Sequence, residues 1–418
     1  MGSVKGSGGA VAQVGIVAGG TAIYSLCQWL ILVLFARVTS AEELGEYSYA
    51  LAVSAPFFIF FGLSLRQVYV SSSGEGYAWR DYLMLRIIAS AGAFVVVLLF
   101  GLFSDSLTAT YILVSLIKAV DLTAEIYLAP PQAVGTVRPL GVYQMINGGA
   151  SLVLFAMGLS LGMLPVLALA MSFLGSLSAA LYALHVGRFA IGARSDGFAW
   201  HARGASARRI CSLALVSAPL GVAGCLNSAM QAAPRYVLER TTGMASVGIF
   251  SAMAYLLIAG NTVVSAVVQF ELPRMVTLFH SGGMGTMNKR VRLLASRMAI
   301  LGAAVVIGIS LWGGRVVTLL YGSGYEDRPT LVFLGLSWAV GAVSWIWDMA
   351  LVVHRAFVIQ MAAALAGAVT AVVASALLVE LNGLRGAGIA VLLATIAVAL
   401  VRHGGLVFLA RRSPEGAQ

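Results

Sequence analysis

The stretch RVTSAEELGEYSYAL, residues 37–51, recurs as RTTGMASVGIFSAMA at residues 240–254. Both copies lie between long apolar segments of the chain. This arrangement predicts a membrane protein built from two equivalent halves, and such architectures mostly move molecules across membranes. At an offset of 203 residues, the identical pairs are Arg37 and Arg240, Thr39 and Thr242, Gly45 and Gly248, and Ser48 and Ser251; the similar pairs are Leu44 and Val247, and Tyr47 and Phe250.

The composition is that of a chain that lies mostly in a bilayer. The 418 residues are 60% hydrophobic and only 10% charged, with a mean hydropathy of +0.93, whereas a soluble domain carries roughly 25% charged residues. A bilayer-spanning helix needs about 20 apolar residues. Twelve segments meet this need: 12–36, 46–67, 82–103, 107–129, 141–162, 164–186, 210–233, 246–270, 294–312, 329–352, 358–380 and 385–409.

A second correspondence supports the duplication. TYILVSLIKAV at 110–120 matches TLVFLGLSWAV at 330–340, at an offset of 220 residues. Six spans separate the copies of the first pattern, and an even number preserves direction, so the halves are parallel repeats about an axis along the membrane normal. We expect an all-α polytopic membrane protein of about 12 transmembrane helices in two six-helix bundles. The expected parts are an N-terminal bundle at 1–190, a cytoplasmic linker at 191–209 and a C-terminal bundle at 210–418.

The basic residues orient the chain. With twelve spans, the termini and the even-numbered loops share one side, and 19 Lys and Arg residues lie at that side against 6 at the other. The positive-inside rule then places both termini in the cytoplasm. The segment 272–293 is expected on this inner side, between the eighth and ninth spans. It leads into the basic stretch NKRVRLLASRM, which either lies on the membrane surface or forms a solvated loop.

No motif for an enzyme or a cofactor accompanies these spans. The chain holds no P-loop, no GxSxG and no HExxH,. Its 3 cysteines form no CxxC pair, so no zinc site is indicated,. We therefore expect no cofactor and no metal. The net charge of +10 is explained by topology, and nucleic acid is not an expected partner.

One span carries an unusual group of charges. Lys118, Asp121 and Glu125 are spaced i, i+3 and i+7 in the segment KAVDLTAE, so they share a helical face,. Each charge at mid-bilayer costs roughly 2.5–3.5 kcal/mol, so these groups must pair or face water. A polar central cavity explains all three; the alternative is a Lys118–Asp121 pair that only orients the helix. Arg66, at the end of the second span, is the next candidate for an anionic ligand, or else an ordinary inner flank.

Other polar and aromatic groups lie in the second half. Asn227, Gln231 and Arg235 form a stripe at i, i+4 and i+8 on the seventh span,. Trp338 and Trp345 lie in the tenth span, where they either line a sugar path or anchor the helix at the interface. Asp348, near that span's inner end, either binds a coupling cation or forms a salt bridge with Arg355. Asp121 and Glu125 are the other ion-coupling candidates. By the second correspondence, Lys118 aligns with Trp338, Asp121 with Gly341 and Glu125 with Trp345.

The first repeat copy and the span after it, VTSAEELGEYSYALAVSAPFFIFFGLSLRQV, resemble the first hairpin of a known family. This is the polysaccharide-biosynthesis, or O-antigen (Wzx-type), flippase family of the multidrug/oligosaccharidyl-lipid/polysaccharide exporter superfamily. The family's hairpin has an acidic pair before L-G-x-Y-S, then an F-G-L turn with a following Arg. These positions are Glu42, Glu43, Leu44, Gly45, Tyr47, Ser48, Phe61, Gly62, Leu63 and Arg66. In the second half, GIFSAM at 248–253, ELPRM at 271–275 and LLYGSGYEDRPTLVFLGL at 319–336 also resemble the family.

The resemblance implies a flippase in a bacterial inner membrane. Its substrate would be an undecaprenyl-diphosphate-linked oligosaccharide, an O-antigen or exopolysaccharide repeat unit, moved from the cytoplasmic to the periplasmic leaflet by alternating access. Arg66 and Lys118 would hold the diphosphate. Membrane lipids surround such a protein, and a glycan polymerase and a chain-length regulator are possible partners.

Two other functions compete with this one. A cation-coupled antiporter for drugs or small metabolites, from the same superfamily, would favour a cavity rich in carboxylates and poor in cations, and Lys118 argues against it. A membrane glycan polymerase or ligase would need a long periplasmic loop, and all the outer loops expected here are short.

Overall fold

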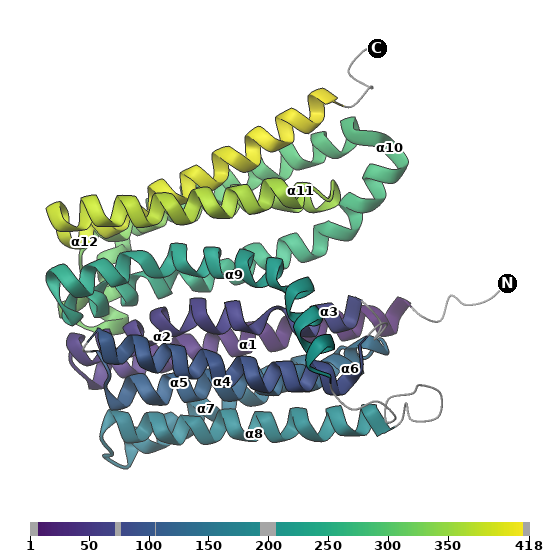
Figure 1. Cartoon of the computed structure of the whole chain (residues 1–418). Helices are drawn as coiled ribbons and strands as arrows, with labels where there is room; N and C mark the ends of the chain where they lie inside the picture. The colour runs from purple at the N-terminus through teal and green to yellow at the C-terminus, as the bar shows by residue number, and fades with distance from the viewer. Residues whose placement is uncertain (1–6, 72–76, 105, 193–205, 413–418) are drawn as a thin grey trace. The chain divides into compact units, whose positions relative to one another are not determined.

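The computed structural model describes residues 7–71, 77–104, 106–192 and 206–412, and within these ranges the chain forms helices and no strands. Figure 1 shows their arrangement. The α-helices are α1 (Ser7–Val38), α2 (Ala41–Gly62), α3 (Leu65–Ser71), α4 (Trp79–Phe103), α5 (Ala109–Glu125), α6 (Ala129–Ala133), α7 (Arg138–Ser160), α8 (Pro165–Gly192), α9 (Ala207–Thr242), α10 (Met244–Tyr321), α11 (Arg328–Val353) and α12 (Phe357–Arg412). Short 3₁₀ turns, η1 (Ile126–Leu128) and η2 (Ser323–Tyr325), follow α5 and α10.

The helices account for the predicted spans. Within the described residues, 10 helical segments are long and apolar enough to cross a membrane. Helix α5, the predicted fourth span, has 17 residues and continues into η1 and α6. Helix α12 contains two predicted spans, because the backbone at Gly383 leaves the helical region (φ 54°, ψ −127°) between them. The prediction of an all-α polytopic membrane protein is confirmed.

The chain divides into two compact units. Unit 1 comprises Met1–Val38 and Ala50–Cys225, and unit 2 comprises Thr39–Tyr49 and Leu226–Gln418. The start of α2 therefore groups with the second half of the chain. Most of the predicted linker, 193–205, lies outside the described residues, and the bundle limits at 190 and 210 stay a prediction.

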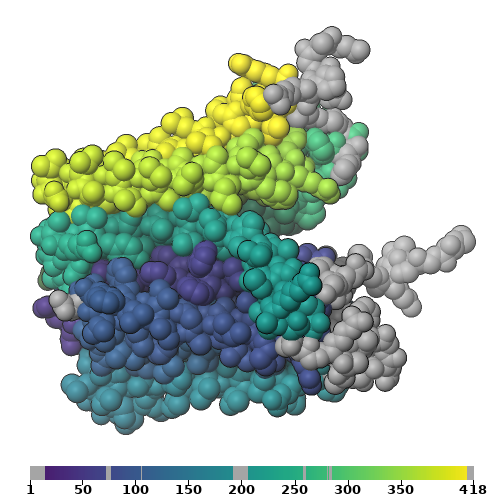
Figure 2. All heavy atoms as spheres, in the orientation of Figure 1, coloured from purple at the N-terminus to yellow at the C-terminus, as the bar shows by residue number. Residues whose placement is uncertain are grey.

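In unit 1, small residues let the helices approach closely. Helix α1 packs on α7, α7 on α8, and α5 on α4 and α8. Gly141 of α7 lies directly against the backbone of α1, where a Cβ would overlap the Ile16 carbonyl, whereas a Cβ on Gly149, two turns further along α7, would meet nothing within 4 Å. Close packing through glycine is typical of helices in a bilayer. On the face shown in Figure 2, side chains fill the spaces between these helices.

The two copies of the opening pattern are in contact within unit 2. A Cβ on Gly45 would overlap the carbonyl oxygen of Met244, and a Cβ on Gly248 would overlap that of Ala41. Met244 is the repeat equivalent of Ala41, so the contact is reciprocal. The motif's Glu43 has a local role: its carboxylate accepts from the Ser40 backbone N–H and its own N–H donates to Ser40 Oγ, each at 3.2 Å. This capping box starts α2.

Residues 272–293, expected on the inner side between the eighth and ninth spans, are part of a continuous helix. Helix α10 runs without interruption from Met244 to Tyr321 and bends on the way (Figure 1). Glu271 accepts two hydrogen bonds from Arg290, at 2.7 and 3.1 Å, and Met275 and Met287 are buried together in one apolar cluster. Buried apolar residues and the ion pairs of Glu271 with Arg274 and Arg290 stabilise this helical segment.

Candidate functional site

A polar cavity of about 370 Å³ lies in unit 1. The spacing of Lys118, Asp121 and Glu125 places all three on its wall, since α5 turns one face toward it. Arg66 of α3 lines the same cavity, so the four charges singled out in the first half of the sequence are brought together. Gln144 and Asn147 of α7 and Tyr24 of α1 add further polar groups.

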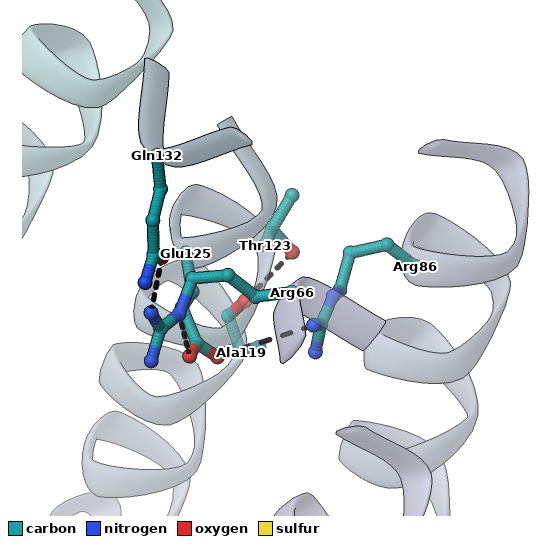
Figure 3. Close-up of polar contacts among 6 residues, drawn as sticks. All are labelled: Arg66, Arg86, Ala119, Thr123, Glu125 and Gln132. Atoms are coloured by element: carbon teal, nitrogen blue, oxygen red, sulfur yellow. Dashed lines mark hydrogen bonds and ion pairs between the residues drawn. The ribbon is translucent and has the colours of Figure 1, made fainter. Parts of the chain in front are cut away.

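A sharp turn between α2 and α3 positions Arg66. Leu63 and Ser64 both have a left-handed backbone, with φ of 50° and 48°, a conformation that non-glycine residues adopt rarely. The turn ends α2 and begins α3, and Arg66 Nε then donates to Glu125 Oε1 at 2.8 Å. Its Nη1 donates to Gln132 Oε1 at 2.7 Å (Figure 3). Arg66 is thus held by two fixed acceptors.

Arg86 of α4 is a functional candidate that the sequence analysis missed. It is fully buried, and its Nη2 lies 3.9 Å from Glu125 Oε2, on the side of the carboxylate away from Arg66 (Figure 3). None of its guanidinium nitrogens has a hydrogen-bond acceptor among the described residues. A lone Arg inside an apolar span was the available signal, since such residues mark functional sites. Glu125 therefore lies between two cations.

Lys118 and Asp121 do not form the helix-orienting pair. Within the described part of the chain, no ion pair joins them at 4 Å or less, and the Lys118 ammonium has no hydrogen-bond partner there. Asp121 instead accepts from Asn147 Nδ2 at 2.9 Å, and Asn147 Oδ1 accepts from Ser176 Oγ at 3.0 Å. Asp121 is held by neutral donors, and Lys118 is left to face the cavity.

The opposite face of α5 is apolar. With α4 and α8 it forms an open groove of about 480 Å³, lined by residues that include Ile87, Leu116, Ala119 and Leu181. Thr123 also lies in the wall of this groove, and its hydroxyl donates to the Ala119 carbonyl oxygen at 2.8 Å (Figure 3). Helix α5 therefore has a charged face toward the unit 1 cavity and an apolar face toward this groove.

Unit 2 has its own cavity, of about 190 Å³, at the equivalent place in the repeat. It is lined by Trp338, Gly341 and Trp345 of α11, the aligned partners of Lys118, Asp121 and Glu125. Gln231 and Arg235 of α9 also line it. The predicted stripe does not reach the cavity in full, because Asn227 is exposed and is not among the lining residues.

Asp348 is bound to a different partner from the one expected. Its Oδ1 lies 3.1 Å from Arg402 Nη2 and accepts from Gln360 Nε2 at 3.1 Å. The salt bridge with Arg355 expected from sequence does not form among the described residues; the partner comes from α12, which packs on α11. No group of three His, Cys, Asp or Glu side chains that could hold a metal occurs in the described residues.

Comparisons with known proteins agree with this architecture. No protein-family model matches the chain. It is 28% identical over 331 residues to the capsular polysaccharide biosynthesis protein CapF of Staphylococcus aureus. The matched region covers 74% of this chain and 77% of the staphylococcal protein.

Solved structures of transporters have the same fold. The lipid II flippase MurJ, in an inward closed conformation, matches with a TM-score of 0.70 and 13% identity over 95% of this chain and 87% of MurJ. The MATE transporter VcmN of Vibrio cholerae matches with a TM-score of 0.65 and 11% identity over 98% of both chains. A MOP superfamily transporter from Pyrococcus furiosus matches with a TM-score of 0.63 and 13% identity over 96% and 95%.

The chain is an all-helical, multi-pass membrane protein with the fold of the solved MATE and MurJ structures. These neighbours are transporters and flippases rather than enzymes. The fold and the similarity to the capsular polysaccharide protein agree with the resemblance that the sequence motifs indicated.

Proposed function

We propose that the protein is a flippase for a polyprenyl-diphosphate-linked oligosaccharide. The observation that carries the proposal is the unit 1 cavity, in which Lys118 has no ion-pair partner and Arg66 is fixed on Glu125 and Gln132. A cation already fixed in place is suited to binding phosphate oxygens, which form short charge-assisted hydrogen bonds with Arg and Lys. The name of the capsular polysaccharide relative supports a glycan as the cargo.

The physical problem is the glycan head. Its hydroxyls and diphosphate would lose their water in hydrocarbon without replacement. The unit 1 cavity supplies that replacement for the diphosphate, which Arg66 and Lys118 hold. The unit 2 cavity, with its tryptophans, offers a binding surface for a sugar. The polyprenyl chain stays in the bilayer, where the apolar face of α5 offers it a groove.

We propose that an ion gradient or the gradient of the substrate itself drives transport by alternating access, because no nucleotide motif is present. Asp121, Glu125 and Asp348 are the coupling candidates. Asp121 is the strongest, since Glu125 and Asp348 are each bound by an arginine whereas Asp121 has neutral donors. The proposed location is the bacterial inner membrane, with both termini cytoplasmic. A glycan polymerase and a chain-length regulator would act on the exported product.

The test is a flipping assay in proteoliposomes. The protein is reconstituted with a fluorescent undecaprenyl-diphosphate oligosaccharide, and a membrane-impermeant glycosidase is added outside. Without protein, only the outer-leaflet half of the label is cleaved; with protein, cleavage proceeds toward completion. A cleaved fraction that stays at half, under an ion gradient of either direction, contradicts the proposal.

A cation-coupled drug antiporter is the second candidate, and the match to the MATE transporter VcmN supports it. The same vesicles distinguish the two functions. Loaded with ethidium and given a proton or sodium gradient, they should keep the dye if the protein is a flippase. Gradient-dependent efflux of ethidium without glycan flipping favours the antiporter.

A further inference from the structure

The unit 2 cavity is an isolated cationic site. Among its lining residues, all in the described part of the chain, Arg235 is the one charged side chain, and no carboxylate lines the wall. The exposed fraction of Arg235 is 8%. An ion buried to this degree loses most of its hydration and gains stability from a counter-ion.

The protein holds the Arg235 guanidinium with neutral groups only. Nε donates to Ser251 Oγ at 2.9 Å, and Nη1 donates to the Gln231 carbonyl oxygen at 2.8 Å. The guanidinium carbon lies 5.4 Å from the centre of the Phe250 ring, within cation–π range. No ion pair involving Arg235 occurs among the described residues. Its geometry is therefore fixed while its charge remains available to a ligand.

The rest of the wall combines aromatic faces with polar groups. Trp338 and Trp345 line the cavity beside Phe250. The Trp338 Nε1 is fully buried and has no acceptor within the described residues, although a buried indole N–H usually finds one. Asn261 adds an amide on the same wall. Flat apolar faces with a few fixed polar groups suit the C–H face and the hydroxyls of a pyranose ring.

We infer that the unit 2 cavity binds an acidic sugar of the glycan, with its carboxylate on Arg235 and its ring against Trp338 and Trp345. This rests on the proposed function and names its substrate class: a lipid-linked oligosaccharide that contains a uronic acid. One cation matches one carboxylate. A diphosphate carries more negative charge than the single cation Arg235 compensates.

The test is ligand binding to the full-length protein in lipid nanodiscs, followed by tryptophan fluorescence. Glucuronate is compared with glucose, with inorganic pyrophosphate and with the methyl ester of glucuronate, which removes the ligand's charge and leaves the protein unchanged. Glucuronate should quench the fluorescence saturably, and its ester and glucose should bind about tenfold more weakly or worse. Equal affinity for glucuronate and its ester overturns the inference, as does tighter binding of pyrophosphate than of glucuronate.

Variants locate the site. Arg235→Gln should lower glucuronate affinity by about tenfold or more, and Trp338→Phe should reduce the fluorescence response. Arg240→Gln, on an exposed position of the same helix, should change neither. A folded Arg235→Gln protein that binds glucuronate as wild type does would contradict the assignment. If that variant does not fold, the comparison of ester and acid on the wild-type protein decides.

The two proposals fail separately. If glucuronate does not bind but a neutral lipid-linked oligosaccharide is flipped normally, the acidic-sugar inference is contradicted and the flippase proposal stands. Absence of flipping for neutral and acidic oligosaccharides alike contradicts the flippase.

Discussion

Glu125 binds Arg66 through one carboxylate oxygen, at 2.8 Å from Nε, in the wall of the unit 1 cavity. Its other oxygen lies 3.9 Å from the fully buried Arg86. The Glu125 carboxylate is therefore the counter-charge both of Arg66, which faces the cavity, and of Arg86, which does not.

Glu125→Gln should destabilise the protein, because it leaves the buried Arg86 without a counter-charge. We expect a loss of about 3 kcal/mol in the free energy of unfolding, at the low end for a broken buried pair because Glu125 is partly exposed. The measurement is thermal unfolding in detergent. Glu380→Gln, on an exposed position of α12, is the control and should change little. Equal stability of the two variants would show that Arg86 is satisfied without Glu125.

Lys118→Ala should impair flipping without impairing folding. Because Lys118 has no ion-pair partner among the described residues, its loss should change the unfolding free energy by less than about 0.5 kcal/mol. In the proteoliposome assay the flipping rate should fall at least about tenfold, the value of one charge-assisted contact. Lys118→Arg should restore much of the rate. A normal rate with alanine excludes the diphosphate contact.

Asp121→Asn should remove the dependence of flipping on an ion gradient, whereas Asp348→Asn should keep it. Asp348→Asn should instead lower the free energy of unfolding by about 2 kcal/mol, since the largely buried Arg402 loses a charged partner,. Flipping rates are measured with and without a proton or sodium gradient, and unfolding in parallel. Gradient dependence that disappears with Asp348→Asn and survives Asp121→Asn would reverse the assignment.

Gly141→Ala should destabilise unit 1, because its Cβ would overlap the backbone of α1. Overpacking of this kind costs about 1–3 kcal/mol. Gly149→Ala, two turns along the same helix and facing open space, should be neutral or slightly stabilising, since alanine favours helix. Thermal unfolding of the two variants gives the comparison, and equal effects would mean that α1 and α7 are not in close contact.

His354 predicts a pH dependence outside the spans. Burial beside Phe279, whose ring centre lies 4.9 Å away, lowers the pKa of His354 below its usual value. The unfolded chain therefore binds a proton before the folded protein does, so stability should fall as pH decreases through about 6.5. Unfolding temperatures between pH 8 and pH 5 should fall less steeply for His354→Gln. Parallel curves for variant and wild type would exclude this contribution.

Local periodicity predicted much of the fold and part of the site. The i, i+3, i+7 spacing of Lys118, Asp121 and Glu125 puts them on one wall, because helical geometry alone decides which residues share a face. The repeat alignment then placed Trp338 and Trp345 at the equivalent wall of unit 2. These inferences needed no knowledge of neighbouring helices.

What the sequence could not predict depends on contacts between distant segments. Asp348 pairs with Arg402, 54 residues away, rather than with the nearby Arg355, because the packing of α12 on α11 chooses the partner. The proximity of Arg86 to Glu125 depends on how α4 and α5 pack, which the sequence alone does not give. The glycine-rich part of α10 is helical because buried methionines and the Glu271–Arg290 pair outweigh local propensity,.

The reciprocal contact at Gly45 and Gly248 has an evolutionary meaning. Each glycine meets the backbone at the repeat equivalent of the position that the other meets. This is the pattern of a twofold homodimer, in which residue i touches j and j touches i. A half-length ancestor carrying the motif would have bound its own copy through this patch, and fusion of two genes would have retained that interface inside one polypeptide. The two glycines are then a single ancestral site, and a side chain gained at either position disrupts the same junction.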